Sequence, residues 1–388
     1  MNIIFCRYRN VCEPDYIDAF KAFDINVIEV FVNELGVTDV SQKAGILLDI
    51  VLKSSPMFVF TINYFPYISM VCEETGIKYV SVSVTCPVVE IYNRTIKNTC
   101  NRVFLFDRQQ YLSVKDENPN GIFYLPLGAA EQRISDLLGE EKSFRYDVSF
   151  IGSLYNEKDP FLELKLSEEK KKYFEDIIDR QLKLSADGQN YLEEAISDED
   201  VELIKSLGKD FYPSDMSVRS IDHFVAVNNY LSPHMTYIER VRILNEISAG
   251  SDYEVHLFTQ SKTDKLRNVI CHGGVETLNE MPLVFRQTKI NLNISTRSIK
   301  TGIPQRVWDV LASGGFLLTN YQEELPENFE NGKHLVMYEN MDELKELIHY
   351  YLEHDDERCE IAGCGHELVA REGTVLNRVI SIIREIAG

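Results

Sequence analysis

Residues 2–125 alternate short apolar segments with amphipathic ones, and this alternation constrains the fold more than any other feature of the sequence. The apolar segments are rich in Val, Ile, Phe and Tyr, which favour strands. Because they are apolar along nearly their whole length, they indicate a parallel sheet that helices cover on both faces. The expected strands are 2–7, 26–31, 57–62, 78–84, 102–106 and 121–125, and the expected helices between them include 40–53 and 66–75.

The same rhythm restarts at residue 146, after the charged segment 131–143. A chain of 388 residues is too long for one ordinary core, so we predict two α/β domains. The expected strands are 146–152, 253–259, 268–271, 289–294, 316–319 and 334–338, and the expected helices include 237–248, 281–288 and 304–313. The predicted domains are 1–142 and 143–370, with a polar helical insertion at about 160–231 and a terminal helix at 371–388 that packs back on the first domain.

Charge and composition exclude several classes of protein. The net charge of −21 argues against broad nucleic-acid binding and against attraction to anionic lipid, since both need basic surface. No apolar run approaches the roughly 18 residues of a membrane span, and the apolar burst before Arg7 is far shorter than a signal-peptide core. The eight scattered cysteines are expected to be reduced thiols. We therefore predict a cytoplasmic protein without a membrane span or a nucleic-acid partner.

The window 281–308 contains no acid in a chain with 61 acids, and it carries five basic residues: Arg286, Lys289, Arg297, Lys300 and Arg306. The loop 295–303 follows a predicted strand, so it lies at the carboxyl edge of the sheet, where such folds bind ligands. A helix follows and directs its first N–H groups at this loop, and Thr301-Gly302 allows a diphosphate to approach the backbone. Arg297, Lys300 or Arg306 can donate to phosphate oxygens. The alternative is a chance cluster with helix-end lysines.

Two further features belong to this predicted anion site. Asp309 lies one helical turn after Arg306, and it either accepts hydrogen bonds from ribose hydroxyls or pairs with Arg306. Gly152-Ser153 ends a predicted strand and offers a second place for an anion to approach the backbone.

The fingerprints of P-loop kinases and of dinucleotide-binding dehydrogenases are absent. The Asp198-Glu199-Asp200 cluster is typical of a helix start, so we predict no metal site.

The positions of the histidines limit the choice of a general base. All eight lie at or beyond His223, so a base in the first domain would have to be a carboxylate. Asp15 is expected to cap a helix that begins near Tyr16, which leaves Glu13 as the candidate base. Asp107 is likewise expected to cap the helix that follows it.

Polar residues after two strands are candidates for contact with the sugar or the acceptor. Asn63 and Tyr64 follow the third expected strand. The residues after strand 316–319 can hydrogen-bond sugar hydroxyls, and they are Asn320, Tyr321, Gln322 and Glu323.

The run 299–325, IKTGIPQRVWDVLASGGFLLTNYQEEL, strongly resembles the CgeB-type spore-maturation glycosyltransferases with the group 1 carboxy-terminal domain. The positions that match the family pattern are Gly302, Ile303, Pro304, Arg306, Val307, Asp309, Gly314, Gly315 and Glu324, and Trp308 replaces the usual Phe. The first half resembles the amino-terminal domain often fused to that family, through segments 12–15, 63–66, 98–107, 124–127 and 147–155. One departure is Thr85-Cys86-Pro87, where many relatives have Asp-Ser-Pro.

This resemblance implies a GT-B architecture, in which two Rossmann-like domains face each other across a cleft. The second domain, with its helical insertion, would hold the donor, and the first would admit the acceptor. Arg306 and Asp309 would lie where group 1 enzymes contact the phosphates and the ribose of the donor. His272, Gly273 and Val275 belong to a segment similar to the one that cradles the base.

The expected function is therefore metal-independent transfer of a sugar from a nucleotide diphospho-sugar to a glycan, cell-surface or protein acceptor, with no other cofactor. The alternatives are a non-catalytic surface or spore assembly protein that keeps the fold as a binding module, which the loss of aspartate at Thr85 would suit, and a GT-B-fold epimerase.

Overall fold

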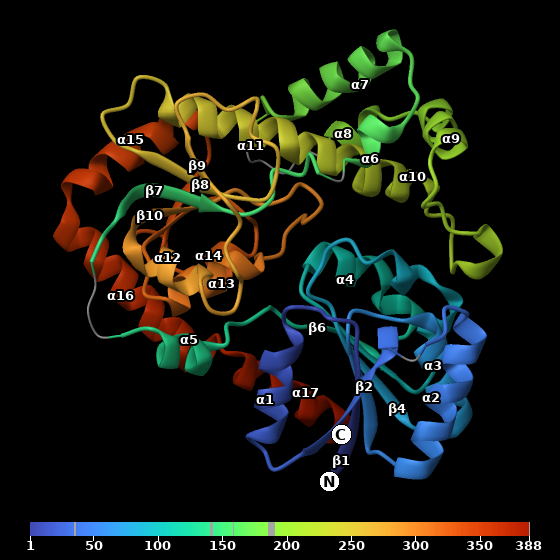
Figure 1. The fold of residues 1–388 in the computed structure, drawn as a ribbon. Coiled ribbons are helices and arrows are strands. Elements are labelled where there is room, and N and C mark those ends of the chain that lie inside the picture. The colour runs from blue at the N-terminus through green and yellow to red at the C-terminus, as the bar shows by residue number, and fades with distance from the viewer. Residues whose placement is uncertain (35, 140–142, 158, 185–190, 388) are drawn as a thin grey trace.

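The computed structural model describes residues 1–34, 36–139, 143–157, 159–184 and 191–387, and these fold around two six-stranded parallel sheets (Figure 1). The first sheet has the order β2-β1-β3-β4-β5-β6. Its strands are β1 (Asn2–Arg7), β2 (Asn26–Phe31), β3 (Phe58–Ile62), β4 (Lys78–Val82), β5 (Asn101–Leu105) and β6 (Ile122–Tyr124). Each lies within three residues of a predicted strand, because a run of consecutive buried Val, Ile and Phe side chains suits a strand covered on both faces.

The second sheet has the order β12-β11-β10-β7-β8-β9, and all its pairs are parallel. Its strands are β7 (Tyr146–Ile151), β8 (Val255–Phe258), β9 (Ile270–His272), β10 (Thr288–Asn293), β11 (Leu317–Asn320) and β12 (Val336–Tyr338). The strand order reverses between β7 and β10, which makes the crevice at their carboxyl ends the place where such sheets bind ligands.

Helices cover both sheets. The first sheet carries α1 (Glu13–Lys21), α2 (Val40–Ser54), α3 (Pro66–Thr75) and α4 (Arg108–Val114). The helix after β6, α5 (Glu131–Leu137), instead packs against helices of the second domain. The second carries α11 (Ser232–Ser248), α12 (Met281–Gln287), α13 (Gln305–Ala312), α14 (Leu325–Asn328), α15 (Met341–Glu353) and α16 (Asp355–Glu372). The fold class predicted from the sequence, two Rossmann-like domains, is confirmed.

The carboxy-terminal helix α17 (Val375–Ala387) crosses back to the first domain, where it lies beside α1 (Figure 1). Its residues Val379 and Ile382 are fully buried and share a hydrophobic core with Phe5 and Phe60 of the first sheet. The predicted domain boundary at residue 142 falls within residues 140–142, which lie outside the described part of the chain.

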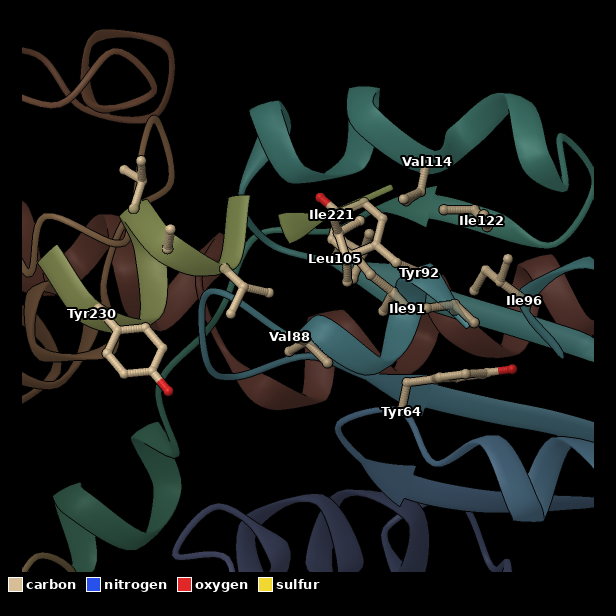
Figure 2. Packing of buried hydrophobic residues seen from close by; sticks show 14 of the residues in the cluster. Tyr64, Val88, Ile91, Tyr92, Ile96, Leu105, Val114, Ile122, Ile221 and Tyr230 are labelled. Carbon is tan, nitrogen blue, oxygen red and sulfur yellow. The ribbon is translucent and has the colours of Figure 1, made fainter. Parts of the chain in front are cut away.

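The insertion between β7 and β8 is helical, as predicted. It comprises α6 (Pro160–Glu163), α7 (Glu168–Gln181), α8 (Tyr191–Ala195), α9 (Asp198–Leu207), α10 (Asp222–Val225) and the π-helical turn η6 (Ala226–Leu231), which runs directly into α11. Its side chains share one hydrophobic cluster with the first domain. Figure 2 shows part of this cluster, in which Ile221 and Tyr230 of the insertion join Tyr92 and Leu105.

Backbone contacts also join the insertion to the first domain. The Val218 N–H donates to the Tyr92 carbonyl at 2.8 Å, and Asn93 and Ser217 form an antiparallel bridge. The ring of Phe224 packs edge-on against Tyr92, with centroids 5.1 Å apart. The insertion therefore bridges the two domains, although the sequence placed it within the second domain alone.

Candidate functional site

The crevice between β7 and β10 holds a glycine whose conformation and surroundings leave no room for a side chain. Gly152 follows β7 with φ +153°, and an added Cβ would lie 2.4 Å from the Arg306 Nη2. Glycine is the residue that adopts this backbone region without strain. The close approach of Arg306 to the backbone at the end of β7 therefore depends on Gly152.

Arg306, in the first turn of α13, reaches into this crevice. Its Nε donates to the Ile151 carbonyl and its Nη1 to the Asn293 Oδ1, both at 2.8 Å. The guanidinium lies 4.7 Å from the centre of the Phe150 ring. Burial, together with the charge of the neighbouring Arg240, lowers the pKa of Arg306 to about 9. In the described residues no carboxylate lies within ion-pair distance of this guanidinium.

Arg240 in α11 is a site residue that the sequence analysis missed. It is 3% exposed, and its Nη1 and Nη2 donate at 2.6 Å to the carbonyls of Ser153 and Ile294, at the ends of β7 and β10. Its guanidinium lies 5.0 Å from the centre of the Phe150 ring that Arg306 also covers. Burial lowers the pKa of Arg240.

These two guanidinium groups place positive charge at the carboxyl ends of β7 and β10, and the carboxylates that act on them, such as Glu157 and Asp309, lie beyond ion-pair distance. Arg240, like Arg306, forms no ion pair with a described carboxylate, and its Nε is buried without a hydrogen-bond partner. A buried charge is costly unless an opposite charge and hydrogen bonds compensate it. The crevice is therefore suited to a multiply charged anion such as a diphosphate, which arginine forks bind well.

Three other basic residues of the acid-free stretch, Lys289, Arg297 and Lys300, differ from Arg306, because carboxylates from distant segments pair with them. Arg297 forms a bidentate pair with Glu239. The Lys300 Nζ lies 2.9 Å from the Glu193 Oε1. The prediction that Arg297 and Lys300 bind phosphate is thus not supported by their surroundings, since both already have anionic partners.

The backbone N–H groups predicted to bind phosphate also have an anionic partner. The N–H groups of Lys300, Thr301 and Gly302 donate to the Asp107 Oδ2 at 2.8, 3.0 and 3.1 Å. Asp107 is also the N-cap of α4, as the sequence predicted, because its Oδ1 accepts from the Gln110 N–H at 2.8 Å. In this arrangement loop 300–302 binds a carboxylate of the first domain.

Asp309 lies one turn after Arg306 in α13, facing a small pocket between the domains. No ion pair joins the two side chains within the described residues. The Asp309 Oδ1 accepts from the Gln305 Nε2 at 2.8 Å. Burial, together with the nearby carboxylate of Asp15, raises the pKa of Asp309 to about 7. Of the two roles considered for Asp309, pairing with Arg306 is therefore not observed.

The pocket that Asp309 faces is lined from both domains. The lining residues are Val11, Cys12, Asp15, Arg133, Ile134, Thr277, Leu278, Met281, Pro282, Phe285, Gln305 and Asp309. The prediction that Asp15 caps a helix is wrong, because α1 begins at Glu13, has Pro14 in its first turn, and contains Asp15. Asp15 instead pairs with Arg133 at 2.7 Å.

The segment expected to cradle the base borders this pocket. The ring of His272 stacks on Phe258 with centroids 4.3 Å apart, and its Nε2 lies 3.1 Å from the His256 Nδ1. Gly273 is exposed and Val275 is half-buried, and the loop continues into Thr277 and Leu278 of the pocket wall. His272, Gly273 and Val275 thus lie just before the pocket wall along the chain and are not part of its lining.

Tyr64 is a core residue, and the prediction that it contacts the acceptor or sugar is wrong. It is 2% exposed and belongs to the hydrophobic cluster drawn in Figure 2. Its hydroxyl donates to the Thr95 Oγ1 at 2.9 Å. Its neighbour Asn63 has φ +61°, and its Oδ1 accepts from the Val84 N–H at 3.1 Å. Asn63 therefore ties the ends of β3 and β4 together.

The candidates at the end of β11 hydrogen-bond to the loop that follows β10 and to β12. The Asn320 Oδ1 accepts from the Ser295 N–H at 2.8 Å. The Tyr321 N–H donates to the Tyr338 carbonyl at 3.0 Å, and Gln322 is 8% exposed. Asn320 and Tyr321 lie at the same sheet edge as Arg306, whereas Gln322 is largely covered.

Glu13, the candidate base, is fully buried. Its Oε2 accepts from the Arg7 Nε at 3.1 Å and its Oε1 from the Tyr8 N–H at 2.6 Å. Neither oxygen of this carboxylate is exposed, so an acceptor hydroxyl cannot approach Glu13 in the way that a general base requires.

We expect Glu13→Gln to act on stability first. Replacing the carboxylate removes its ion pair with Arg7, which should lower the free energy of unfolding by about 2 kcal/mol. Urea unfolding measures this loss, and Glu34→Gln, which breaks the exposed pair with Arg9, is the control with little expected effect. Unchanged stability with complete loss of turnover would instead make Glu13 the base.

Comparison with known proteins gives a family match and a fold match. Residues 240–384 match the family described as glycosyl transferase-like. Among curated proteins there is no match. The chain is similar in structure to a glycosyltransferase from Rickettsia africae ESF-5, with a TM-score of 0.54 and 13% identity over 100% of this chain and 98% of that one.

Two further solved structures are similar over almost their whole length. HepE from Anabaena, solved with UDP-glucose, has a TM-score of 0.51 and 10% identity, covering 100% of this chain and 99% of that one. The β-glucosyltransferase of phage T4 has the same values.

At these identities the similarities establish the fold. The chain has the GT-B architecture of glycosyltransferases, and its second half carries a glycosyl transferase-like domain. The fold of the chain is thus that of GT-B proteins, and the family match is confined to residues 240–384. Among the residues described, none of the helices combines the length and the apolar character needed to cross a membrane.

Proposed function

We propose that this protein transfers a sugar from a nucleotide diphospho-sugar to a glycan, cell-surface or protein acceptor, without a metal ion or another cofactor. The observation that carries the proposal is the pair of guanidinium groups, Arg306 and Arg240, that cover one Phe150 ring and have no carboxylate partner among the described residues. They lie at the carboxyl ends of β7 and β10, where the strand order reverses.

The geometry suits the parts of such a donor. The diphosphate would lie over Gly152 and accept from the Arg306 Nη2, and its charge would balance both arginines. Developing charge on the leaving diphosphate is stabilised most by donors that are already in place, which is the role we assign to Arg306. The ribose would donate to Asp309, and the base would contact the segment 272–275.

Two comparisons guide the choice of the first donor to test. HepE was solved with UDP-glucose, and also with UDP and glucose. A structure of the T4 enzyme likewise contains UDP-glucose. Together with the resemblance of 299–325 to the CgeB-type family, these support a UDP-sugar donor and a spore or cell-surface acceptor.

Binding and turnover test the proposal separately. Isothermal titration with UDP, GDP, ADP, CDP and dTDP is expected to show binding of at least one of them, and no binding of any would contradict the donor site. Slow release of nucleotide from a matching sugar donor without acceptor is the expected sign of a transferase. Binding without release across a full donor panel would favour the non-catalytic binding module.

The metal requirement is a separate prediction. Because Arg306 and Arg240 supply the positive charge that a metal ion supplies elsewhere, we expect EDTA to leave nucleotide release unchanged. The measurement compares initial rates before and after chelation, and then after addition of Mg²⁺ or Mn²⁺. A strong loss with EDTA that either ion restores would overturn the metal-free mechanism.

A further inference from the structure

The two domains meet where the end of β5 reaches the loop after β10. A single carboxylate oxygen, the Asp107 Oδ2, accepts from three successive N–H groups of the second domain, those of Lys300, Thr301 and Gly302, within 2.8–3.1 Å. Asp107 is 0% exposed. Hydrogen bonds to a charged acceptor are about twice as strong as neutral ones, so this is a firm attachment.

The other oxygen of Asp107 serves the first domain. It caps α4 through the Gln110 N–H. Capping needs only one oxygen of the carboxylate, and asparagine or serine does it about as well. The three bonds to loop 300–302 are therefore a second role that capping alone does not explain.

A second carboxylate repeats the arrangement from the opposite side. Glu324 of the second domain, 1% exposed, accepts on its Oε1 from the Arg108 N–H at 2.8 Å and from the Thr301 hydroxyl at 2.7 Å. Its Oε2 accepts from the Tyr124 hydroxyl. The Thr301 Oγ1 in turn accepts from the Gln109 N–H at 3.2 Å. Each domain thus places one buried carboxylate in the other.

The backbones also approach closely here. A Cβ added at Gly302 would lie 3.0 Å from the Asp107 Cα and 3.0 Å from the ring of Phe106. Such a distance requires the neighbours to give way, and one of them is backbone. The glycine is therefore needed for the contact between the domains.

We infer that Asp107 is a positioning residue that fixes the loop 300–302 to the first domain. Since this loop leads directly into α13, Asp107 also sets the distance of Arg306 and Asp309 from the first domain. The consequence for catalysis rests on the proposed function, because the donor contacts of α13 and the acceptor side would have to be held in register for transfer. The attachment itself is a property of the fold.

The test is amide hydrogen exchange of residues 300–302 in Asp107→Asn, without donor or acceptor. Asparagine keeps the cap through its oxygen but turns an NH2 group toward three N–H donors, so exchange at 300–302 should become at least 10-fold faster. The matched control is Asp39→Asn, because Asp39 caps α2 through the Gln42 N–H at 2.9 Å and is remote from the interface. It should leave exchange at 300–302 unchanged.

Unchanged exchange at 300–302 in folded Asp107→Asn would overturn the inference. If that variant does not fold, Gly302→Ala gives the same test, since its methyl group would press the two backbones apart. A donor-hydrolysis assay of the Asp107 variant then reports the catalytic consequence as a raised KM for the donor. Because exchange is measured without substrate, it can succeed even if the proposed transferase activity fails.

Discussion

Replacing Arg306 by methionine is expected to weaken binding of the nucleoside diphosphate by about 10- to 100-fold, because hydrogen bonds to charged groups contribute about 1.5–3 kcal/mol. The guanidinium Nη2 lies over Gly152, and under the proposed function the diphosphate would accept from it and supply the counter-charge. Isothermal titration at constant pH and salt measures the change. The same variant should lose most of its donor turnover.

The stability of this variant should change little, which separates binding from folding. The lowered pKa of Arg306, about 9 in the fold, means that the folded state disfavours the charge. Below pH 9 the group is charged in both states, so the folded protein bears this cost throughout the neutral range. Removing the charge relieves that cost, but it also removes the hydrogen bonds to Ile151 and Asn293. The two effects oppose each other, so the free energy of unfolding should change by less than about 1 kcal/mol.

Arg297→Met is the matched control, since both arginines belong to the same acid-free stretch. Arg297 is held by Glu239, so its loss should leave that carboxylate unpaired and lower the free energy of unfolding by about 1 kcal/mol at this half-exposed site. Nucleotide affinity should remain within about 3-fold, which is under 1 kcal/mol. Equal loss of binding in both variants would mean that general positive charge, not Arg306, holds the anion.

The contrast between these arginines shows what the sequence could reveal about the site. The absence of acids from 281–308 marked the region correctly as unusual. It could not show that Glu239 and Glu193, which lie 58 and more than 100 residues away along the chain, fold onto Arg297 and Lys300. Compensation of charge is a property of three-dimensional contacts, so a local window of sequence cannot report it.

Arg240 was missed for the same reason. It lies in a helix rich in alternating charges, and nothing in its neighbours distinguishes it from the half-exposed Arg242 two residues later. Only the packing of α11 against β7 and β10 makes Arg240 buried and directs it to Phe150. Tyr64 is the opposite case, because its position next to Asn63 after a strand suggested the cleft, whereas its ring turns into the core.

The fold was more predictable than the site. Buried parallel strands have a compositional signal of their own, and the Gly314-Gly315 pair and Pro304 correctly bounded α13. The prediction for α11 began five residues too late, at 237 instead of Ser232, because the π-helical turn η6 leads into this helix without a break in polarity. The packing of the insertion on the first domain had no sequence signal, since it depends on contacts between distant segments.

Asp309→Asn is expected to remove a pH dependence of nucleotide binding centred near neutrality. Burial raises the pKa of Asp309 to about 7, so the carboxylate ionises between about pH 6 and 8. Ribose hydroxyls donate more strongly to the ionised carboxylate than to the neutral carboxyl group, by roughly 1.4 kcal/mol. The nucleotide affinity of the wild type should therefore rise by about 10-fold as the pH rises through this range. The variant should bind with the weaker affinity at both ends of this range.

Stability should change with pH in the opposite direction. The pKa of Asp309 lies above its ordinary value of 3.8, so between about pH 4 and 7 the folded state binds more protons than the unfolded state. Its contribution to the free energy of unfolding therefore falls as the pH rises through this window and stays low above it. Asp309→Asn should lose this fall and be more stable than the wild type at pH 8, by on the order of 1–3 kcal/mol. Urea unfolding at several pH values measures the difference.

Asp15 offers an independent check on the same carboxylate. It faces the same pocket, and its negative charge raises the pKa of Asp309, while its partner Arg133 lowers it. Asp15→Asn removes the negative charge that raises the pKa of Asp309. It also leaves Arg133 without its partner, so that Arg133 lowers the pKa of Asp309 more strongly. The midpoint of the binding profile should consequently move to lower pH, with the amplitude retained. If the midpoint stays in place in Asp15→Asn, or if the pH dependence persists in Asp309→Asn, a group other than Asp309 carries the titration. Neither outcome is possible if Asp309 is the titrating group, because the first variant changes its pKa and the second removes its charge.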